Sequence, residues 1–145
     1  MQASARNQLQ GVVSAILPGA VNAEVEIQLA GGEVLVASLT LESLKRLTLE
    51  LGKPVVALIK APHIFLVSDF GGYRLSARNQ MTGTVTRLKV GPVNTEVELQ
   101  LQGGQLIVST ITHESSQNLV LKKGMLVTAV FKAGSVILAV ETAST

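Results

Sequence analysis

The stretch Val21-Asn22-Ala23-Glu24-Val25-Glu26-Ile27-Gln28-Leu29 decides the fold. Its aliphatic residues alternate strictly with polar ones, and a period of two is typical of a β-strand with one buried face. Gly31-Gly32 follows and can adopt the positive φ angles of a turn, so that Glu33 to Leu39 forms the returning arm of a hairpin. The stretch therefore predicts an antiparallel, all-β protein.

The same pattern occurs twice along the chain. The segment Ser4-Ala5-Arg6-Asn7-Gln8 recurs 72 positions later as Ser76-Ala77-Arg78-Asn79-Gln80, and the hairpin recurs from Val93 to Ile111. The offset holds without gaps to the C-terminus, so the chain is a tandem duplication. We expect a first domain at residues 1–68, a short connector at residues 69–75 and a second domain at residues 76–141.

Each copy contains signals for three more strands and one helix. The segment Leu41 to Glu50 has leucines near helical spacing, with Thr40 as N-cap and Gly52 as the C-terminal stop. Five strands with a short helix after the third predict two tandem OB-like five-stranded barrels, each with one short helix. The further strands are expected at Leu9 to Leu17, Pro54 to Lys60 and Ile64 to Ser68, with counterparts in the second copy.

The composition suits small barrels that assemble with one another. Hydrophobic residues make up 47% of the 145 residues and aromatic ones only 3%, so the core must consist of branched aliphatic side chains. Domains of about 70 residues bury a modest fraction of their surface, so oligomerisation is expected. We find neither a leader segment nor a run that could cross a membrane, and expect a cytoplasmic protein without a membrane partner.

Residue types that build common catalytic sites are sparse. The chain has no cysteine, and its two histidines, His63 and His113, are not equivalent in the repeat and lack the spacing of zinc ligands. No nucleophile elbow, P-loop or dinucleotide fingerprint is present. The paired glutamates of the alternating strand are most simply a solvated face. We therefore expect no catalytic residues, no metal-cation site, no catalytic cofactor and no enzymatic activity.

A polar and positive cluster is the better candidate for a site. Ser4-Ala5-Arg6 offers a hydroxyl, a backbone N–H and a guanidinium, and Lys60 adds a second charge. Such groups suit a tetrahedral dianion. Thr40 and Ser43 add hydroxyls at a predicted helix start. The residues alone leave an alternative open, in which Thr40 is only a cap and the cations are surface charges paired with glutamates such as Glu24.

Four short motifs follow one another in the first copy, and their counterparts follow in the same order in the second copy. They are S-A-R-N at Ser4 to Asn7, G-A-V-N-A-E at Gly19 to Glu24, T-x-E-S at Thr40 to Ser43 and K-A-P at Lys60 to Pro62. Together they resemble the Mop family of molybdate-binding domains, also described as TOBE-type domains. The tandem arrangement resembles molbindins of the di-Mop type, and the resemblance covers essentially all 145 residues.

The resemblance implies a homotrimer that holds molybdate or tungstate at its subunit interfaces, for storage and homeostasis. One chain would supply the Ser-Ala-Arg and Lys-Ala segments of a site, and its neighbour the threonine and serine. The implied molybdate-binding residues are Ser4, Ala5, Arg6, Thr40, Ser43, Lys60 and Ala61 in the first copy, and Ser76, Ala77, Arg78, Thr112, Ser115, Lys132 and Ala133 in the second. A further anion site on the threefold axis would involve Val21, Asn22, Val93 and Asn94.

The second copy departs from the family pattern at two places. Gly134 stands where the first copy has Pro62, and Pro92 stands where it has Ala20. Pro92 lacks a backbone N–H near the proposed axial site, so we expect the two ends of the trimer to differ in affinity. We also find no helix-turn-helix segment of the kind that related molybdate-responsive repressors carry, and expect no nucleic-acid partner.

Two other functions remain as alternatives. An OB-fold nucleic-acid-binding protein would stack bases on aromatic side chains beside a basic groove. The aromatic residues Phe65, Phe70, Tyr73 and Phe131 are few and scattered, and the net charge is only +2. A molybdopterin-handling protein would need a larger apolar pocket with converging polar groups, which the sequence does not reveal.

Overall fold

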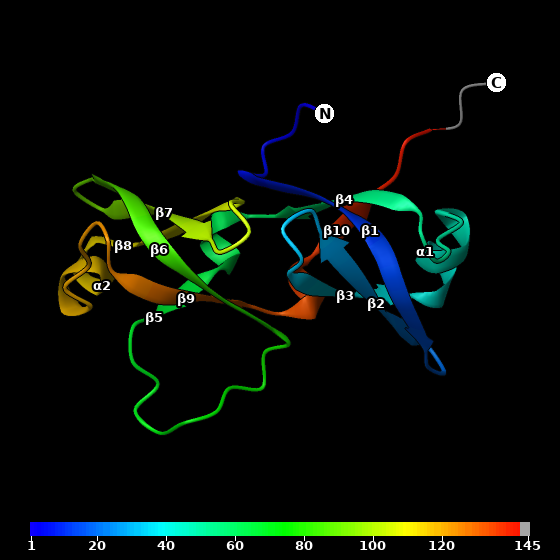
Figure 1. Ribbon diagram of the computed structural model, residues 1–145, viewed down its shortest axis with the longest axis horizontal. Coiled ribbons are helices and arrows are strands. Elements are labelled where there is room, and N and C mark those ends of the chain that lie inside the picture. Colours follow the sequence, from blue (N-terminus) through cyan, green and yellow to red (C-terminus); the bar gives the residue numbers. More distant parts are fainter. Residues whose placement is uncertain (143–145) are drawn as a thin grey trace.

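The computed structural model describes residues 1–142, which form two lobes side by side (Figure 1). The first repeat contains the strands β1 (Asn7–Pro18), β2 (Asn22–Leu29), β3 (Val34–Thr40), β4 (Pro54–Ile59) and β5 (Phe65–Val67). The second contains β6 (Asn79–Val90), β7 (Asn94–Leu101), β8 (Leu106–Thr112), β9 (Leu126–Phe131) and β10 (Ile137–Ala139). The helices are α1 (Leu41–Arg46) and α2 (His113–Asn118), with 3-10 turns η1 (Ala61–His63) and η2 (Ala133–Ser135). The expectation of an all-β fold with two OB-like five-stranded lobes and one short α-helix in each is confirmed.

The two repeats exchange their last strands. The sheet of the first lobe has the strand order β10-β4-β1-β2-β3, and that of the second lobe has the order β5-β9-β6-β7-β8. In Figure 1 the orange-red end of the chain accordingly lies in the lobe that is otherwise blue and cyan. Every neighbouring pair is antiparallel, with Leu138 opposite Ala57 and Leu66 opposite Ala129. Each hydrogen-bonded sheet combines strands of both repeats. The division into domains at residues 1–68 and 76–141 therefore describes the two sequence repeats, and it stays a prediction.

Because the last strands are exchanged, we expect a destabilising substitution in the last strand of one repeat to weaken the sheet of the other repeat. Leu138 in β10 is 6% exposed and packs in the core. The change Leu138→Ala should lower the free energy of unfolding by about 2–4 kcal/mol, because it removes buried methyl groups and leaves a cavity. Hydrogen exchange should then accelerate at the amides of β4, which belongs to the first repeat, more than at those of β9. Faster exchange confined to β9 would contradict the exchanged pairing.

One hydrophobic core runs through both lobes. Its members are aliphatic residues on the inner faces of the strands, and Phe131, 1% exposed, is an aromatic member of this core. The alternation of β2 is confirmed, since Ala23, Val25, Ile27 and Leu29 are each at most 2% exposed. The cluster therefore joins buried residues of both lobes.

The turns of the two hairpins meet between the lobes. A Cβ on Gly31 would lie 2.6 Å from the Cα of Gly103, a contact that no other residue type could make without moving the backbone. The next glycines, Gly32 and Gly104, have φ angles of 95° and 93°, as the tight turns require. The paired glycines thus serve both the turn and the contact between repeats.

Two local expectations were wrong. The helix ends at Arg46 rather than near Glu50, because Thr48 adopts a φ of 50° and ends the helix before Gly52 is reached. Val21 precedes β2 and is 71% exposed rather than facing the core.

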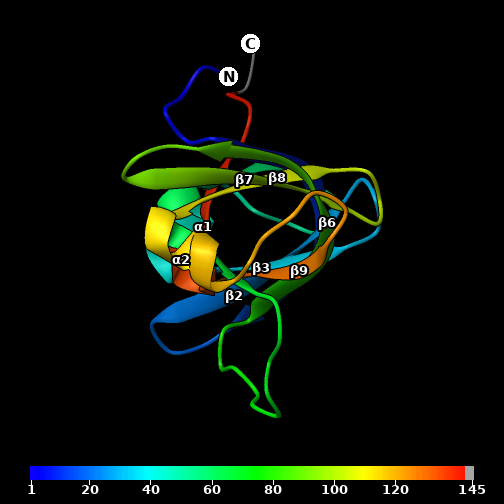
Figure 2. The ribbon, with the colours of Figure 1, turned by 90° about the vertical axis from the view of Figure 1, so that its left-hand side faces the viewer.

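Helices in residues 1–142 are all too short to cross a membrane. The connector between β5 and β6 extends away from both lobes as a loop (Figure 2).

Candidate functional site

The fold brings Arg6 and Lys60 to the same end of one strand pair. Asn7, the first residue of β1, pairs with Ile59, the last residue of β4, so the residues just outside the ladder lie side by side. Lys60 then leads directly into η1. The second repeat has the same arrangement, because Asn79 pairs with Phe131 between Arg78 and Lys132. Each Ser-Ala-Arg segment therefore lies beside the Lys-Ala segment of its own repeat.

A buried asparagine fixes each of these clusters against the other repeat. The side chain of Asn79, 1% exposed, accepts from the N–H of Val36 and donates to its carbonyl, both at 2.8 Å. Asn7, 2% exposed, makes the same pair of 2.8 Å bonds with Val108 and a 3.2 Å bond to the carbonyl of Ile59. The amide groups of both side chains thus complete the edges of β3 and β8, and they set where the neighbouring arginines can reach.

Each arginine forms an ion pair with a glutamate of the opposite repeat. The Nη1 of Arg6 lies 2.7 Å from the Oε1 of Glu96 in β7, and Arg78 pairs in the same way with Glu24 in β2. The side chains are half to one-third exposed, at 53% and 36% in the first pair and 49% and 38% in the second. Pairs this exposed contribute only about 0–1 kcal/mol, so an incoming dianion can compete for the guanidinium.

The clefts around the two arginines differ. Arg78 borders a cleft of about 350 Å³, whose other residues come from the first repeat: Leu17, Pro18, Gly19, Asn22, Ala23, Glu24 and Ser38. Arg6 lies at a small space of about 10 Å³ in the second lobe, lined also by Arg87, Lys89, Glu96, Glu98 and Val108. The space around Arg6 is therefore narrower and richer in cations.

The predicted hydroxyl groups lie at the other end of their own lobe. Thr40 pairs with Asn22, at the end of the sheet opposite to Asn7 and Ile59. Its Oγ1 accepts from the N–H of Ser43 at 3.1 Å and donates to the Ser43 hydroxyl at 3.0 Å. The Ser43 hydroxyl therefore keeps its own hydrogen to donate elsewhere. Thr112 and Ser115 repeat this arrangement, with bonds of 3.1 and 2.8 Å.

The two turns predicted for an axial site lie at the tips of the lobes. Val21 and Val93 are 71% and 72% exposed, and their carbonyls accept from the N–H groups that begin α1 and α2. Asn22 and Asn94 accept with their backbone carbonyls from Gly19 and Gly91, which closes the turns. The axial anion site stays a prediction.

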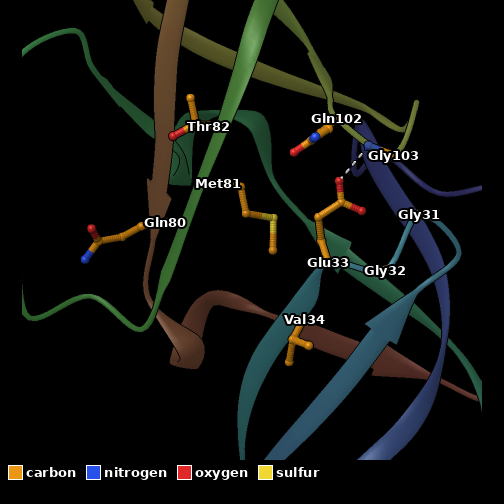
Figure 3. Close-up of a pocket in the computed structure, with 9 residues that line it drawn as sticks. All are labelled: Gly31, Gly32, Glu33, Val34, Gln80, Met81, Thr82, Gln102 and Gly103. Carbon is orange, nitrogen blue, oxygen red and sulfur yellow. Dashed lines mark hydrogen bonds between the residues drawn. The ribbon is translucent and has the colours of Figure 1, made fainter.

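A cavity of about 640 Å³ lies between the repeats but contains none of the predicted anion-binding residues (Figure 3). Glu33 lines it and accepts from the N–H of Gly103 at 3.0 Å, across the contact between the two hairpin turns. Gln80, Met81, Thr82 and Gln102 complete much of its wall. With no arginine or lysine in its lining, this cavity does not suit a dianion. Within residues 1–142, no three His, Cys, Asp or Glu side chains gather as metal ligands would.

Sequence reasoning missed the residues that surround the arginines. Glu24 and Glu96 were interpreted as a solvated face or as partners within one repeat, whereas they pair with the arginine of the other repeat. Arg87 and Lys89 were not singled out at all. The signal available in the sequence was the asparagine next to the arginine in the S-A-R-N motif, which the structure shows to make a fixed contact with the other repeat. The exchange of strands, which decides which glutamate the arginine meets, leaves no local pattern in the sequence.

A known protein family matches each of the two repeats separately. Residues 3–66 and 75–138 each match the TOBE domain family. The chain is 44% identical over 141 residues, 97% of its length, to the molybdenum transport protein ModE of Herbaspirillum seropedicae. It is 44% identical over 139 residues, 96% of its length, to the molybdenum-pterin-binding protein MopA of Rhodobacter capsulatus. It spans about half of these relatives, 52% of each.

A solved structure is similar over the whole chain. It is that of the cytoplasmic molybdate-binding protein ModG in a form with molybdate bound, with a TM-score of 0.94 and 54% identity over 97% of this chain and 100% of that one. By their names these proteins bind or transport molybdenum species, so the expectation that the chain is not an enzyme is confirmed. The resemblance to the Mop family is confirmed as well, and the chain belongs to the TOBE domain family, as a tandem pair of TOBE domains.

Proposed function

We propose that this chain binds molybdate or tungstate, for storage and homeostasis in the cytoplasm, at sites completed by a second copy of the chain in a homotrimer. The observation that carries the proposal is the 54% identity to ModG, a molybdate-binding protein, over 97% of this chain. In this proposal the molybdate-binding residues are the Ser-Ala-Arg, Lys-Ala, threonine and serine groups of both repeats. Molybdate is then the cargo of the protein and not a cofactor.

The arrangement of charges supports an oxyanion ligand. Arg6 and Lys60 flank the end of one strand pair, so a fork of N–H donors and a compact ammonium group start from neighbouring backbone positions, and both types of group suit an oxyanion. The backbone N–H groups of Ala5 and Ala61 are close in sequence to these charges and can add neutral donors. A tetrahedral dianion has enough oxygens to accept from all of them.

The separation of the hydroxyl groups argues against a site made within one repeat. Thr40 and Ser43 lie at the opposite end of the lobe from Arg6 of the same repeat. A strand of 12 residues such as β1 spans roughly 35–40 Å, too far for Thr40 and Arg6 to share an ion, whereas Arg78 of the second repeat lines a cleft with Asn22, the strand partner of Thr40. In the proposed trimer a neighbouring chain brings its serine to the arginine, and the exposed valines at the lobe tips add apolar contact.

Calorimetric titration with sodium molybdate in sulfate-free buffer tests the proposal. We expect saturable binding of molybdate and tungstate, weaker binding of sulfate, and a native mass spectrum with three chains and discrete additions of the oxyanion mass. The absence of heat with both molybdate and tungstate would refute the proposed ligand. A mass shift matching a pterin would favour the alternative that the name of MopA suggests.

Mixed oligomers test whether the sites lie between chains. One variant would carry Arg6→Ala with Arg78→Ala, and the other Ser43→Ala with Ser115→Ala. Oligomers formed by co-expressing the two variants should regain part of the binding, because some interfaces then combine an intact arginine with an intact serine. If all the groups of a site came from one chain, the mixture would bind no better than its components.

The absence of a nucleic-acid partner remains a prediction. A relative 35% identical over 140 residues is the DNA-binding transcriptional dual regulator ModE of Escherichia coli K12, of which this chain spans 52%. In the proposed function the matched half of such proteins is the part that holds the oxyanion. Titration with duplex DNA alongside molybdate would separate the two activities.

A further inference from the structure

The glutamates that pair with the arginines stand in the way of an anion. Glu24 and Glu96 occupy guanidinium N–H groups that a bound dianion would need. Once displaced, each carboxylate would still lie near the ligand and repel it unless another cation took it up. The fate of the displaced carboxylate should therefore affect the affinity of each site.

The two lobes differ in what such a carboxylate can reach. Across the β6–β7 pair, Glu96 stands opposite Lys89 and Glu98 stands opposite Arg87. Side chains directly opposite each other in an antiparallel pair are close enough to interact. Glu98 also accepts from the hydroxyl of Thr86 at 2.9 Å. All four charged groups line the space around Arg6, so the second lobe surrounds its carboxylates with alternative partners.

In the first lobe the residues opposite the glutamates are uncharged. At the equivalent places on β1, Leu17 stands opposite Glu24 and Ala15 stands opposite Glu26. Leu17 lines the cleft that Arg78 borders, and among residues 1–142 Arg78 is the only cationic residue that lines it. Within residues 1–142 the ion pair of Glu24 is with Arg78 alone. A dianion that takes Arg78 would therefore leave Glu24 without a cation opposite it on the neighbouring strand.

We propose that Glu24 and Glu96 are built-in competitors for the anion, and that Lys89, helped by Arg87, relieves this competition in the second lobe alone. The chain would then carry two unequal classes of site, and the class containing Arg6 would bind molybdate more tightly than the class containing Arg78. The inference rests on the proposed function. It makes Glu24 and Glu96 determinants of affinity and Lys89 a positioning residue that acts through Glu96.

Removing a competitor tests the first half of the proposal. Titration with molybdate in an Arg6→Ala background reports the sites that contain Arg78. There, Glu24→Gln should lower the Kd about three- to tenfold, because it removes both the rival ion pair and a nearby negative charge. Glu26→Gln is the matched control, since this residue lies two positions along the same strand and its side chain makes no ion pair within residues 1–142. An unchanged or raised Kd for Glu24→Gln, or an equal gain for Glu26→Gln, would overturn the inference.

Exchanging the residues opposite the glutamates tests the second half. In an Arg78→Ala background, Lys89→Leu should raise the Kd about three- to tenfold, and in the Arg6→Ala background Leu17→Lys should lower it by a similar factor. Lys123→Leu is the control. Like Lys89→Leu, it replaces an exposed lysine of the second repeat by the residue at the equivalent position of the first repeat, here Leu51, but it lies away from both clefts. If the Arg6→Ala and Arg78→Ala variants, without further changes, bound molybdate with equal Kd values, the proposed inequality between the two classes of site would be refuted.

A double variant distinguishes whether Lys89 acts through Glu96, which we call the relay, or attracts the anion directly. If Lys89 acts by holding the displaced carboxylate, Lys89→Leu should have little effect once Glu96→Gln is present. If the effect of Lys89→Leu persists in full, the lysine attracts the ligand directly and the relay is wrong. Failure of the proposed function looks different, because the unmodified protein would then bind neither molybdate nor tungstate.

Discussion

The combined change Arg6→Ala and Arg78→Ala should weaken molybdate binding by at least about a hundredfold at both classes of site. Each substitution removes charge-assisted hydrogen bonds that contribute about 1.5–3 kcal/mol apiece, and an arginine can form two of them with one oxyanion. The fold should survive, because both side chains are about half exposed and their ion pairs contribute little to stability. Calorimetric titration measures the loss, and circular dichroism with native mass spectrometry checks fold and assembly.

The matched control removes two positive charges elsewhere. Arg74 in the connector and Lys123 in the turn before β9 are exposed and line neither arginine cleft. Arg74→Ala with Lys123→Ala should leave the Kd within about twofold, since exposed charges beyond roughly 10 Å are screened at ordinary ionic strength. Unchanged stoichiometry and affinity in the Arg6 and Arg78 double variant would show that the site lies elsewhere.

The change Asn79→Leu should lower the free energy of unfolding by about 2–5 kcal/mol. It leaves the N–H and the carbonyl of Val36 without their partners at a buried edge of β3, and each unpaired buried group costs about 1–3 kcal/mol. Urea denaturation followed by far-ultraviolet circular dichroism measures the loss. Hydrogen exchange at the amide of Val36 should accelerate more than at Val25 in the centre of the neighbouring strand.

Asn118→Leu is the control for that change, because Asn118 is exposed at the end of α2 and makes no side-chain hydrogen bond within residues 1–142. It should alter the free energy of unfolding by about 0.5 kcal/mol or less. A similarly small effect of Asn79→Leu would mean that water or a relaxed backbone replaces the asparagine. The bridge between the repeats would then lie in hydrophobic contact alone.

The fold was predictable because its signals are local. The alternation in β2 and the glycine pair after it fix a hairpin, and the duplication carries the same inference to the second repeat. The place of β5 and β10 was not predictable from such signals. A three-residue strand such as Ile137–Ala139 has the same pattern whether it pairs within its repeat or across, and only the packing of the whole chain selects its partner.

The candidate site was predictable in part. The arginine and lysine of each repeat were expected together, and the register of β1 with β4 brings Arg6 beside Lys60. The pairing of Arg78 with Glu24 depends on the contact between repeats, which charge and spacing along the sequence do not reveal. The contribution of a second copy of the chain remains a prediction for the mixed oligomers to test.

The exchange of last strands also bears on how the protein is made. The sheet of the first lobe needs β10, whose residues Ile137–Ala139 are synthesised after those of β1 to β9. Chains grow at about 5–20 residues per second and earlier domains commonly fold first, but here the first lobe cannot close early. Both lobes should therefore complete in a single late step, and a nascent chain that stalls before β10 would display an unpaired edge of β4.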